Sequence, residues 1–289
     1  QWFDDRVTEA AVEYLEGQAD ADRPFAAVVG YLLPHCPFIA PRDLFEYYYD
    51  RVTIPEQPTD QPDAIERFRA DRDILEPLPE ERIRVARAAY YAMTEYVDRR
   101  MGTVLSALDR AGLAEDTLVV YASDHGEMAG EHGCWWKSTY YEGSAGVPLI
   151  ARLPGEVPAG SVSDAIVNLT DLGPTFADLA GTAFETPVDG RSLWPTLRGD
   201  HPGDWTDETF SEFFEHRGAN PSRMIRSGRF KLWDHPLDPD LSPALFDLEA
   251  DPDEERDLAD DPEYADVRER LLSRLHADWD PEWVAERST

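Results

Sequence analysis

The chain has 289 residues, and its 27 basic and 59 acidic side chains give a formal net charge of -32 and a pI near 4.4. A field of this sign repels nucleic acids and anionic membrane surfaces, so we expect neither as a partner. Disorder is the alternative explanation for so much charge, but 42% hydrophobic and 11% aromatic content argue for a folded core. We therefore expect a folded protein with an acidic, solvated surface.

Lysine is rare in this sequence. Lys137 and Lys231 are two of the 27 basic residues, and the remaining 25 are arginines. An acidic excess with arginine in place of lysine indicates adaptation to high salt, which screens the self-repulsion. This adaptation favours the cytoplasm of a halophile, with secretion as the open alternative. Neither a signal peptide nor an apolar stretch of about 18 to 20 residues is visible.

The N-terminal half predicts helices that alternate with strands. Ala11 and Leu15 share one face of a first helix, and residues 25–33 (FAAVVGYLL) form the apolar run of a strand buried on both faces. Residues 39–79, rich in Pro, Asp and Tyr, predict a long and mostly irregular surface segment. A long helix follows, and Gly112 stands where its C-terminal cap belongs.

Two further apolar runs, residues 117–122 (TLVVYA) and 147–153 (VPLIARL), predict two more buried strands. Helices that alternate with fully apolar strands indicate an α/β fold with a mainly parallel sheet sandwiched by helices. Later in the chain, short strand-like pieces and an amphipathic helix near residues 263–278 are typical of a small antiparallel sheet plus a helix. We therefore predict an α/β core at 1–203 and a small C-terminal α+β subdomain at 204–289.

Polar side chains follow two of the predicted strands where each leaves the sheet. His35 follows the first strand, and Asp124 and His125 follow the second. Ligands collect beyond the carboxyl ends of parallel strands, so we expect these side chains on one rim. An Asp-His pair can present two ligands to one metal ion, and Lys137 can offset the charge of an anionic substrate. The alternative is an aspartate that caps a turn and an idle surface lysine.

Seven blocks of the sequence carry a resemblance to a known family. They are PHCPF (34–38), SDHGEMAGEHGCWWK (123–137), YYEGSAGVPLIARLPG (140–155), LTDLGPTFADLAG (169–181), DGRSLWPTL (189–197), RMIRSGRFKLW (223–233) and LFDLEADPDEERDLA (245–259). Their order is similar to that in the sulfatases, of the alkaline-phosphatase-like superfamily. In detail the chain resembles the branch with Asp-His in the metal motif, which includes iduronate-sulfatase-like, choline-sulfatase-like and phosphonate monoester hydrolase-like enzymes. The resemblance implies the alkaline-phosphatase-like fold.

The resemblance also implies roles for four residues. Asp124 matches the metal-binding aspartate of the family, and His125 matches the second ligand or a sulfate contact. Lys137 matches the lysine that holds the sulfate oxygens. His35 matches the histidine of the Pro-His-x-Pro motif, which contacts the sulfate and is a candidate proton donor to the leaving oxygen. The implied metal is a divalent cation, Ca²⁺ first, with Mn²⁺ and Mg²⁺ as alternatives.

Other residues of the metal motif are expected to support the site. For Glu127 and His132, support of the metal-binding residues and hydrogen bonds within the loop are at least as good an explanation as a catalytic role. Trp135 and Trp136 are expected to wall the pocket.

The chain departs from the family pattern at two places. Neither Cys36 nor Cys134 lies in the Cys-x-Pro-Ser-Arg motif that yields formylglycine, so both are expected to be buried free thiols. Residues 219–223 (ANPSR) carry alanine at the nucleophile position, and we interpret them as a coincidence. Asp4 and Asp5 precede a helix and are not assigned to the metal. The chain thus resembles the C-terminal two-thirds of a sulfatase, with formylglycine expected in an N-terminal segment outside it.

Three functions stay open on the sequence. Metal-assisted hydrolysis of a small-molecule sulfate ester is preferred. Hydrolysis of a phosphonate monoester or phosphodiester by the same superfamily is the alternative enzyme, and a non-catalytic sulfatase-like binding protein is the alternative class. A Cys- or Ser-x-Pro-x-Arg motif in frame upstream of Gln1 would favour an enzyme. The exact ester and the oligomeric state are left open.

The charge of -32 generates a first prediction. Raising ionic strength from about 0.1 M to about 1 M shortens the screening length from about 10 Å to about 3 Å, so mutual repulsion of the surface carboxylates should weaken. We expect the melting temperature to rise between these two KCl concentrations. A melting temperature that stays flat or falls would refute the adaptation to salt.

Overall fold

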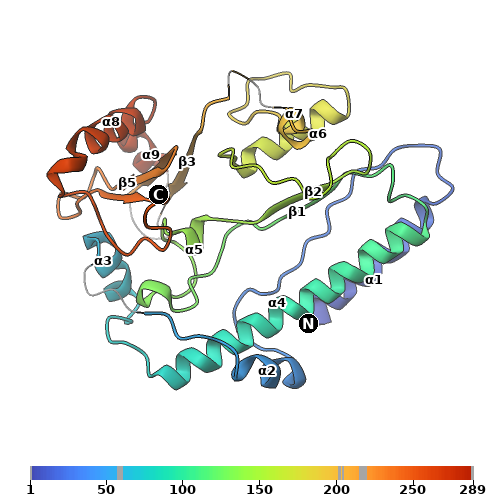
Figure 1. The fold of residues 1–289 in the computed structure, drawn as a ribbon, viewed down its shortest axis with the longest axis horizontal. Helices are drawn as coiled ribbons and strands as arrows, with labels where there is room; N and C mark the ends of the chain where they lie inside the picture. The colour runs from blue at the N-terminus through green and yellow to red at the C-terminus, as the bar shows by residue number, and fades with distance from the viewer. Residues whose placement is uncertain (1, 57–60, 201–202, 204, 215–219, 288–289) are drawn as a thin grey trace.

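The computed structural model describes residues 2–56, 61–200, 203, 205–214 and 220–287 (Figure 1). Among these residues, no helix is both long and apolar enough to cross a membrane. The α-helices are α1 (Trp2–Gln18), α2 (Arg42–Tyr49), α3 (Asp63–Asp71), α4 (Glu80–Arg110), α5 (Glu142–Ala145), α6 (Leu172–Leu179), α7 (Trp194–Leu197), α8 (Ala265–His276) and α9 (Pro281–Arg287). The strands are β1 (Val119–Ala122), β2 (Leu149–Arg152), β3 (Glu208–Phe213), β4 (Ser222–Ser227), β5 (Phe230–Asp234) and β6 (Ala244–Asp247). Short 3-10 helices lie at Glu131–Gly133, Leu169–Asp171 and Pro262–Tyr264.

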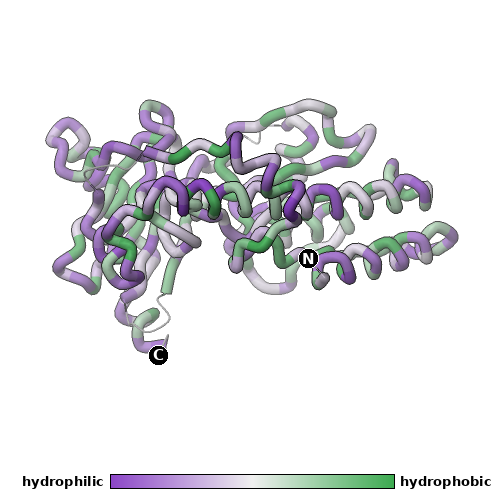
Figure 2. Tube along the Cα trace, turned by 90° about the horizontal axis from the view of Figure 1, so that it is seen from below, coloured by the Kyte–Doolittle hydropathy of each residue, from purple (hydrophilic) through white to green (hydrophobic). Residues whose placement is uncertain are grey.

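Helix α4 is the longest element, with 31 residues, and helices α1 and α2 pack along it (Figure 1). Figure 2 shows hydrophobic and hydrophilic residues alternating along α1, the helix that starts at the N label, as expected of an amphipathic surface helix. The apolar face of α1 ends at Leu15, which packs with Ala107 and Leu108 of α4. The predicted first helix and the predicted long helix are therefore both present.

The segment predicted to be mostly irregular contains two helices. Helix α2 begins after Pro41 and helix α3 after Pro62, so that proline stands at the start of each. Helix α3 buries Ile65 and Phe68, spaced three residues apart on one face. The prediction for residues 39–79 did not anticipate these two helices, because a single turn of apolar spacing is a weak signal in a stretch rich in Pro and Asp.

Strands β1 and β2 correspond to two of the three predicted apolar strands. They pair antiparallel with each other, with Val120 opposite Ala151. No parallel pair occurs among the residues that the structure describes, so the predicted parallel pairing is not found there. Apolar content marks a buried strand, whereas the direction of pairing depends on which strands meet in space.

The remaining predicted strand, the first in chain order at residues 25–33, does not form in the structure. Val28 is 98% exposed and Leu32 is 57% exposed. A strand with two apolar faces needs neighbours on both sides and a ladder of hydrogen bonds. Within the described residues, the segment finds no strand to pair with.

The four C-terminal strands form one antiparallel sheet in the order β3-β4-β5-β6, and helix α8 packs on it, as the sequence predicted. Side chains alternate between the two faces of the sheet. Ile225 and Leu232 pack with α8, whereas Met224 and Trp233 pack on the other side with residues of the loop at 128–141. The sheet is therefore held between a helix and the loop that follows the Asp-His motif. The predicted boundary between residues 203 and 204 stays a prediction.

His132 lies buried in this loop. Its ring stacks on Tyr141 with the ring centroids 3.8 Å apart, and its Nε2 lies 3.0 Å from the carbonyl oxygen of Asp253. Its φ of 53° is left-handed. Burial lowers the pKa of His132 below its usual value of 6.5, so the ring is neutral at neutral pH.

We expect His132→Asn to flatten the pH dependence of the melting temperature. The buried histidine binds a proton less readily than the unfolded chain does. Its stability contribution is therefore complete above the unfolded-state pKa of about 6.5 and is lost as the pH falls through the lower folded-state pKa. Asparagine tolerates the left-handed backbone. Thermal unfolding between about pH 7.5 and about pH 5 should show the smaller fall in the variant.

The matched control is His35→Asn, which changes an exposed histidine and should keep the slope of the unmodified protein. A second, partly buried histidine, His235, also has a pKa lowered by burial and should leave part of the slope in the His132 variant. Equal slopes for the unmodified protein and the His132 variant would contradict the assignment.

Candidate active site

A cavity of about 600 Å³ lies between the Asp-His motif, helix α3 and the C-terminal sheet. This volume is in the range of small-molecule sites. Asp124, His125 and Lys137 line one part of it. The remaining lining includes Arg67, Phe68 and Asp71 of α3, Glu212 and Phe213 of β3, and Trp233, His235 and Asp238.

Lys137 and His35 lie in direct contact. The Nζ of Lys137 is 3.1 Å from the Nε2 of His35, and the Nδ1 of the same ring is 2.7 Å from the carbonyl oxygen of Cys36. A carbonyl oxygen can only accept, so Nδ1 carries a proton and donates it. The Nε2 lone pair then accepts from the ammonium of Lys137. This geometry assigns His35 as a neutral imidazole whose Nε2 faces the cation.

Asp124 and His125 form the second half of the site. The Oδ2 of Asp124 is 3.5 Å from the Nε2 of His125, and the side chain of Asp124 is 85% exposed. The Nδ1 of His125 donates to the carbonyl oxygen of Gly126 at 2.8 Å. This hydrogen bond leaves the Nε2 lone pair free, which is the usual arrangement of a metal-ligating histidine. The two atoms that could bind an ion are therefore 3.5 Å apart.

The structure brings the four predicted residues together in two contacting pairs, Lys137 with His35 and Asp124 with His125. Lys137 joins the pairs because it contacts His35 and shares the cavity with Asp124 and His125. The roles assigned to the four residues stay predictions.

The donor set of Asp124 and His125 fits part of a divalent metal site. The carboxylate of Asp124 suits Ca²⁺, Mn²⁺ and Mg²⁺, whereas the imidazole of His125 is a softer ligand than these ions prefer, and Ca²⁺ takes six to eight oxygen ligands. No group of three or more His, Cys, Asp or Glu side chains with metal-binding geometry occurs in the described part of the chain. These two residues would therefore hold the ion together with ligands from elsewhere.

Gly126 follows the Asp-His pair at a place with no room for a side chain. A Cβ atom there would lie 2.2 Å from the carbonyl oxygen of Gly143 and 3.2 Å from that of Gly146. The N–H of Gly126 donates to the carbonyl oxygen of Ser144 at 2.8 Å. Helix α5 thus presses its backbone against the motif and holds Gly126 in place.

The loop before Lys137 has an unusual backbone. Trp136 and Ser138, the two neighbours of Lys137, have φ values of 67° and 80°. Non-glycine residues rarely adopt the left-handed region, and such residues gather at functional sites. Glu127 Oε1 accepts from the N–H of Trp136 at 2.5 Å, and burial raises the pKa of Glu127. Glu127 therefore supports the loop, as the sequence suggested.

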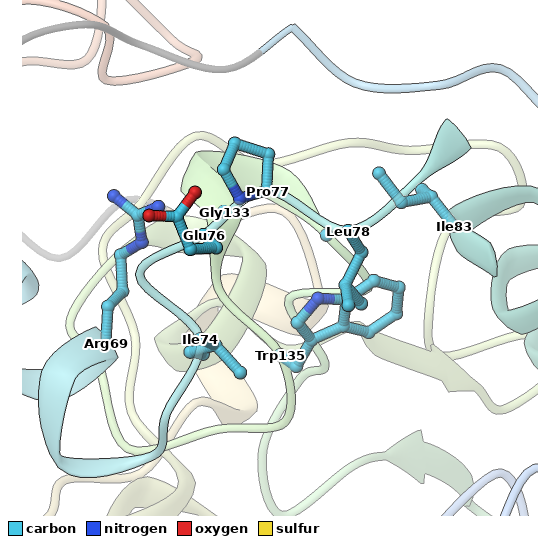
Figure 3. Close-up of a pocket in the computed structure, with 9 residues that line it drawn as sticks. Arg69, Ile74, Glu76, Pro77, Leu78, Ile83, Gly133 and Trp135 are labelled. Atoms are coloured by element: carbon cyan, nitrogen blue, oxygen red, sulfur yellow. The ribbon is translucent and has the colours of Figure 1, made fainter. Parts of the chain in front are cut away.

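Trp135 anchors the same loop away from the large cavity. Figure 3 shows it beside Ile74, Leu78 and Ile83 around a second cavity, of only about 10 Å³. This volume holds at most about one water molecule. The expectation that both tryptophans wall the active-site pocket was wrong, because Trp135 turns to this packing site and Trp136 does not line the large cavity.

Asp4 is a site residue that sequence reasoning missed. Its side chain is fully buried, and its Oδ1 accepts from the N–H of Leu32 at 2.7 Å and from that of Leu33 at 3.3 Å. These residues lead directly into Pro34 and His35, so α1 holds the segment that presents the histidine. The expectation that Asp4 precedes a helix was wrong, because α1 begins at Trp2 and Asp4 lies in its first turn. An acidic residue in the first turn of a helix is equally well explained by a surface position.

The two cysteines are free thiols in the described structure. Cys134 is buried, and burial raises the pKa of its thiol to about 12, so it is unreactive at neutral pH. Cys36 is only partly buried, which differs from the expectation, and its Sγ lies 3.8 Å from Nδ1 of His35. In the ANPSR segment, Ala219 lies outside the described residues.

Comparisons with known proteins identify the family. The sequence matches the family model Sulfatase over residues 1–182 and the model N-sulphoglucosamine sulphohydrolase, C-terminal, over residues 130–279. The chain therefore belongs to the sulfatase family.

Two curated relatives illustrate the match. The chain is 34% identical over 274 residues to choline-sulfatase of Rhizobium meliloti, covering 90% of this chain and 52% of the relative. It is 31% identical over 296 residues to arylsulfatase K of Mus musculus, covering 93% of this chain and 52% of the relative. The chain thus spans about half the length of the curated relatives that it matches.

Solved structures show the same fold. The phosphonate monoester hydrolase of Agrobacterium radiobacter matches with a TM-score of 0.81 at 28% identity, covering 94% of this chain and 60% of that one. Structures of sulfatase-like proteins match similarly. The predicted fold class, the alkaline-phosphatase-like α/β fold with a C-terminal antiparallel sheet, is confirmed.

The close approach of α5 to Gly126 generates a prediction. Gly126→Ala should destabilise the protein by about 1–3 kcal/mol, because the added methyl group meets backbone rather than a movable side chain. Gly102→Ala, in α4 and with open space around its Cβ position, should instead stabilise by about 0.5–1 kcal/mol. Urea unfolding of both variants measures the difference, and a neutral Gly126→Ala would mean that α5 does not press on the motif.

Proposed function

We propose that this chain supplies half of the active site of a sulfatase that hydrolyses a small-molecule sulfate ester. The observation that carries this proposal is the 3.1 Å contact of Lys137 with His35 at a cavity that Asp124 and His125 also line. Membership of the sulfatase family supports the same reaction. A protein that only binds has no need for all four groups, so the binding protein stays the weaker alternative.

Lys137 and His35 perform complementary tasks in the proposed reaction. The ammonium of Lys137 offsets charge on the non-bridging sulfate oxygens in a chain that otherwise repels anions. As the anion enters, Lys137 turns its donors to the sulfate, and the negative charge favours a proton on Nε2 of His35. Nδ1 stays bound to the Cys36 carbonyl, which keeps the ring oriented. His35 then protonates the ester oxygen as its bond to sulfur breaks.

The sulfatase family generally uses a metal ion and a formylglycine residue. We propose that Asp124 and His125 hold a divalent cation, Ca²⁺ first and Mn²⁺ or Mg²⁺ as alternatives, which would offset charge on the sulfate when bound. The formylglycine nucleophile would come from outside these 289 residues, because the Cys-x-Pro-Ser-Arg motif does not occur in them.

The substrate that we propose to test first is the sulfate ester of a cationic alcohol. Choline-sulfatase is among the relatives. Besides Lys137, the cavity lining carries the rings of Phe68 and Trp233 and the carboxylates of Asp71 and Glu212. Aromatic faces and carboxylates together suit an organic cation. Neither nucleic acid nor a membrane is part of the proposal, and the acidic composition supports a halophile's cytoplasm as its location.

The phosphonate monoester hydrolases are the basis of a second candidate function. Two of them share the fold at 28% and 30% identity. Phosphonate monoesters and phosphodiesters are also tetrahedral anions, so the same cation, lysine and histidine suit them.

The deciding experiment compares matched esters on the full product of the gene. Choline sulfate and nitrophenyl sulfate should be hydrolysed faster than a nitrophenyl phenylphosphonate, and chelation of divalent metals should abolish the activity. Faster phosphonate hydrolysis would favour the second candidate, and hydrolysis of none of these esters would count against both.

The role of Lys137 generates a prediction for the same full product. An ammonium is a compact charge, whereas a guanidinium is broad and planar. Lys137→Arg should therefore displace the anion and lower turnover by about 10²-fold or more, because errors near 1 Å in geometry can cost that much. Its melting temperature should change little, since the side chain serves the substrate.

The control is Arg42→Lys, which makes the reverse exchange in an exposed ion pair with Glu46 and should leave turnover unchanged. Near-normal turnover in Lys137→Arg would mean that Lys137 contributes only diffuse positive charge.

A further inference from the structure

The second lysine of the chain is fully buried. Lys231 is the second residue of β5, and 0% of its side chain is exposed. Its Nζ is 2.9 Å from Oε1 of Glu142 and forms a second ion pair with Oε1 of Glu254. The side chain of Glu254 is 2% exposed. A buried ammonium is costly unless it is paired, so these two carboxylates keep it in place.

Glu142 connects this ion cluster to helix α5, whose first residue it is. Its backbone N–H donates to Oε2 of Glu254 at 2.5 Å, so Glu254 binds Lys231 with one oxygen and the start of α5 with the other. Arg226 of β4 adds a contact of 3.7 Å to Oε2 of Glu142. Two cations and two carboxylates therefore balance at the point where the C-terminal sheet meets α5.

Helix α5 in turn contacts the Asp-His motif. The carbonyl oxygen of Ser144 accepts from the N–H of Gly126 at 2.8 Å, and no side chain could fit between Gly126 and Gly143. The carbonyl oxygen of Gly126 accepts from Nδ1 of His125 at 2.8 Å. A continuous set of contacts thus runs from the Lys231 cluster through α5 and Gly126 to the ring of His125.

We propose that Lys231 is a positioning residue, through which the C-terminal sheet sets the backbone of Gly126 and thereby the orientation of His125. The catalytic consequence rests on the proposed function, because His125 matters to turnover only if it belongs to the active site. The positioning itself is a property of the described chain and can be measured without substrate.

The energetics support a positioning role over a purely stabilising one. Replacing a buried ion cluster by well-packed apolar residues is often neutral or stabilising. The sheet already has apolar packing on both faces, with Leu232 and Trp233 adjacent to the lysine. Apolar residues at these positions would not fix the start of α5. The ammonium of Lys231 does so, because it binds the side chain of Glu142 and also Glu254, which accepts from the N–H of Glu142.

Hydrogen exchange of the backbone amides tests the proposal on the 289-residue chain. In Lys231→Met, the amide of Gly126 should exchange at least about tenfold faster than in the unmodified chain, because its acceptor on α5 is no longer fixed. Amides of β4 and β5 that pair with each other should keep their protection. This pattern distinguishes loss of position from loss of overall stability, which would speed exchange at all of these amides together.

Two further variants keep the test decisive. Glu142→Gln removes only the partly exposed carboxylate and keeps the backbone N–H, so it should reproduce the local effect even if Lys231→Met fails to fold. Arg229→Met removes the partner of another buried carboxylate in the same sheet, Asp247, whose side chain accepts from Arg229 and from the backbone N–H groups of Glu249 and Ala250. In Arg229→Met, the exchange rate of the Gly126 amide should not change relative to the rates of the paired amides of β4 and β5.

Unchanged exchange at Gly126 in Glu142→Gln, or uniform acceleration across the sheet and the motif in both cluster variants, would overturn the proposal. Since exchange needs no substrate, this outcome is independent of the proposed function. On the full gene product, a lower kcat with an unchanged KM in Glu142→Gln would then link the positioning to sulfate ester hydrolysis, and unchanged kinetics with altered exchange would count against the proposed role of His125 alone.

Discussion

The site depends on the contact between two stretches of backbone, at Gly126 and at Gly143. A Cβ atom on Gly126 would lie 2.2 Å from the carbonyl oxygen of Gly143, so the approach requires glycine. At this distance the hydrogen bond from Gly126 to Ser144 can form, and Gly126 can accept from the ring of His125. The Asp-His pair is therefore held by helix α5 as well as by its own strand, and anything that moves the helix moves the motif.

The two lysines of the chain occupy opposite environments near this contact. Lys137 faces a cavity and His35, where its charge is available to an anion. Lys231 is fully buried between two glutamates, where its charge is matched inside the protein. A compact ammonium with three donors suits both places, whereas a planar guanidinium is broader. With the role proposed for Lys137, these two environments account for lysine at two of the 27 basic positions of a chain that otherwise uses arginine.

The loop that carries Lys137 is held from several sides. Glu127 binds the N–H of Trp136, Arg87 of α4 donates to the carbonyl oxygen of Ala129 at 2.9 Å, and His132 binds the backbone of Asp253. These contacts hold left-handed residues on both sides of Lys137, which the loop alone would not favour. Helix α4 and the loop after β6 thus both contribute to the position of the loop that carries this ammonium group. Such support is what a preorganised anion site requires.

The sequence by itself determined the family, the two long helices and the C-terminal sheet with its helix, and it singled out the residues of two contacts, Lys137 with His35 and Asp124 with His125. These features depend on local periodicity or on contiguous motifs, which a single chain displays directly. Only the tertiary structure decided that β1 and β2 run antiparallel, that residues 25–33 pair with no strand in the described part of the chain, and that Asp4 holds the segment before His35. It also decided that Lys231 reaches α5, 89 residues earlier in the chain. Each of these depends on which distant groups meet in space, and the spacing of residues along the chain carries no record of that.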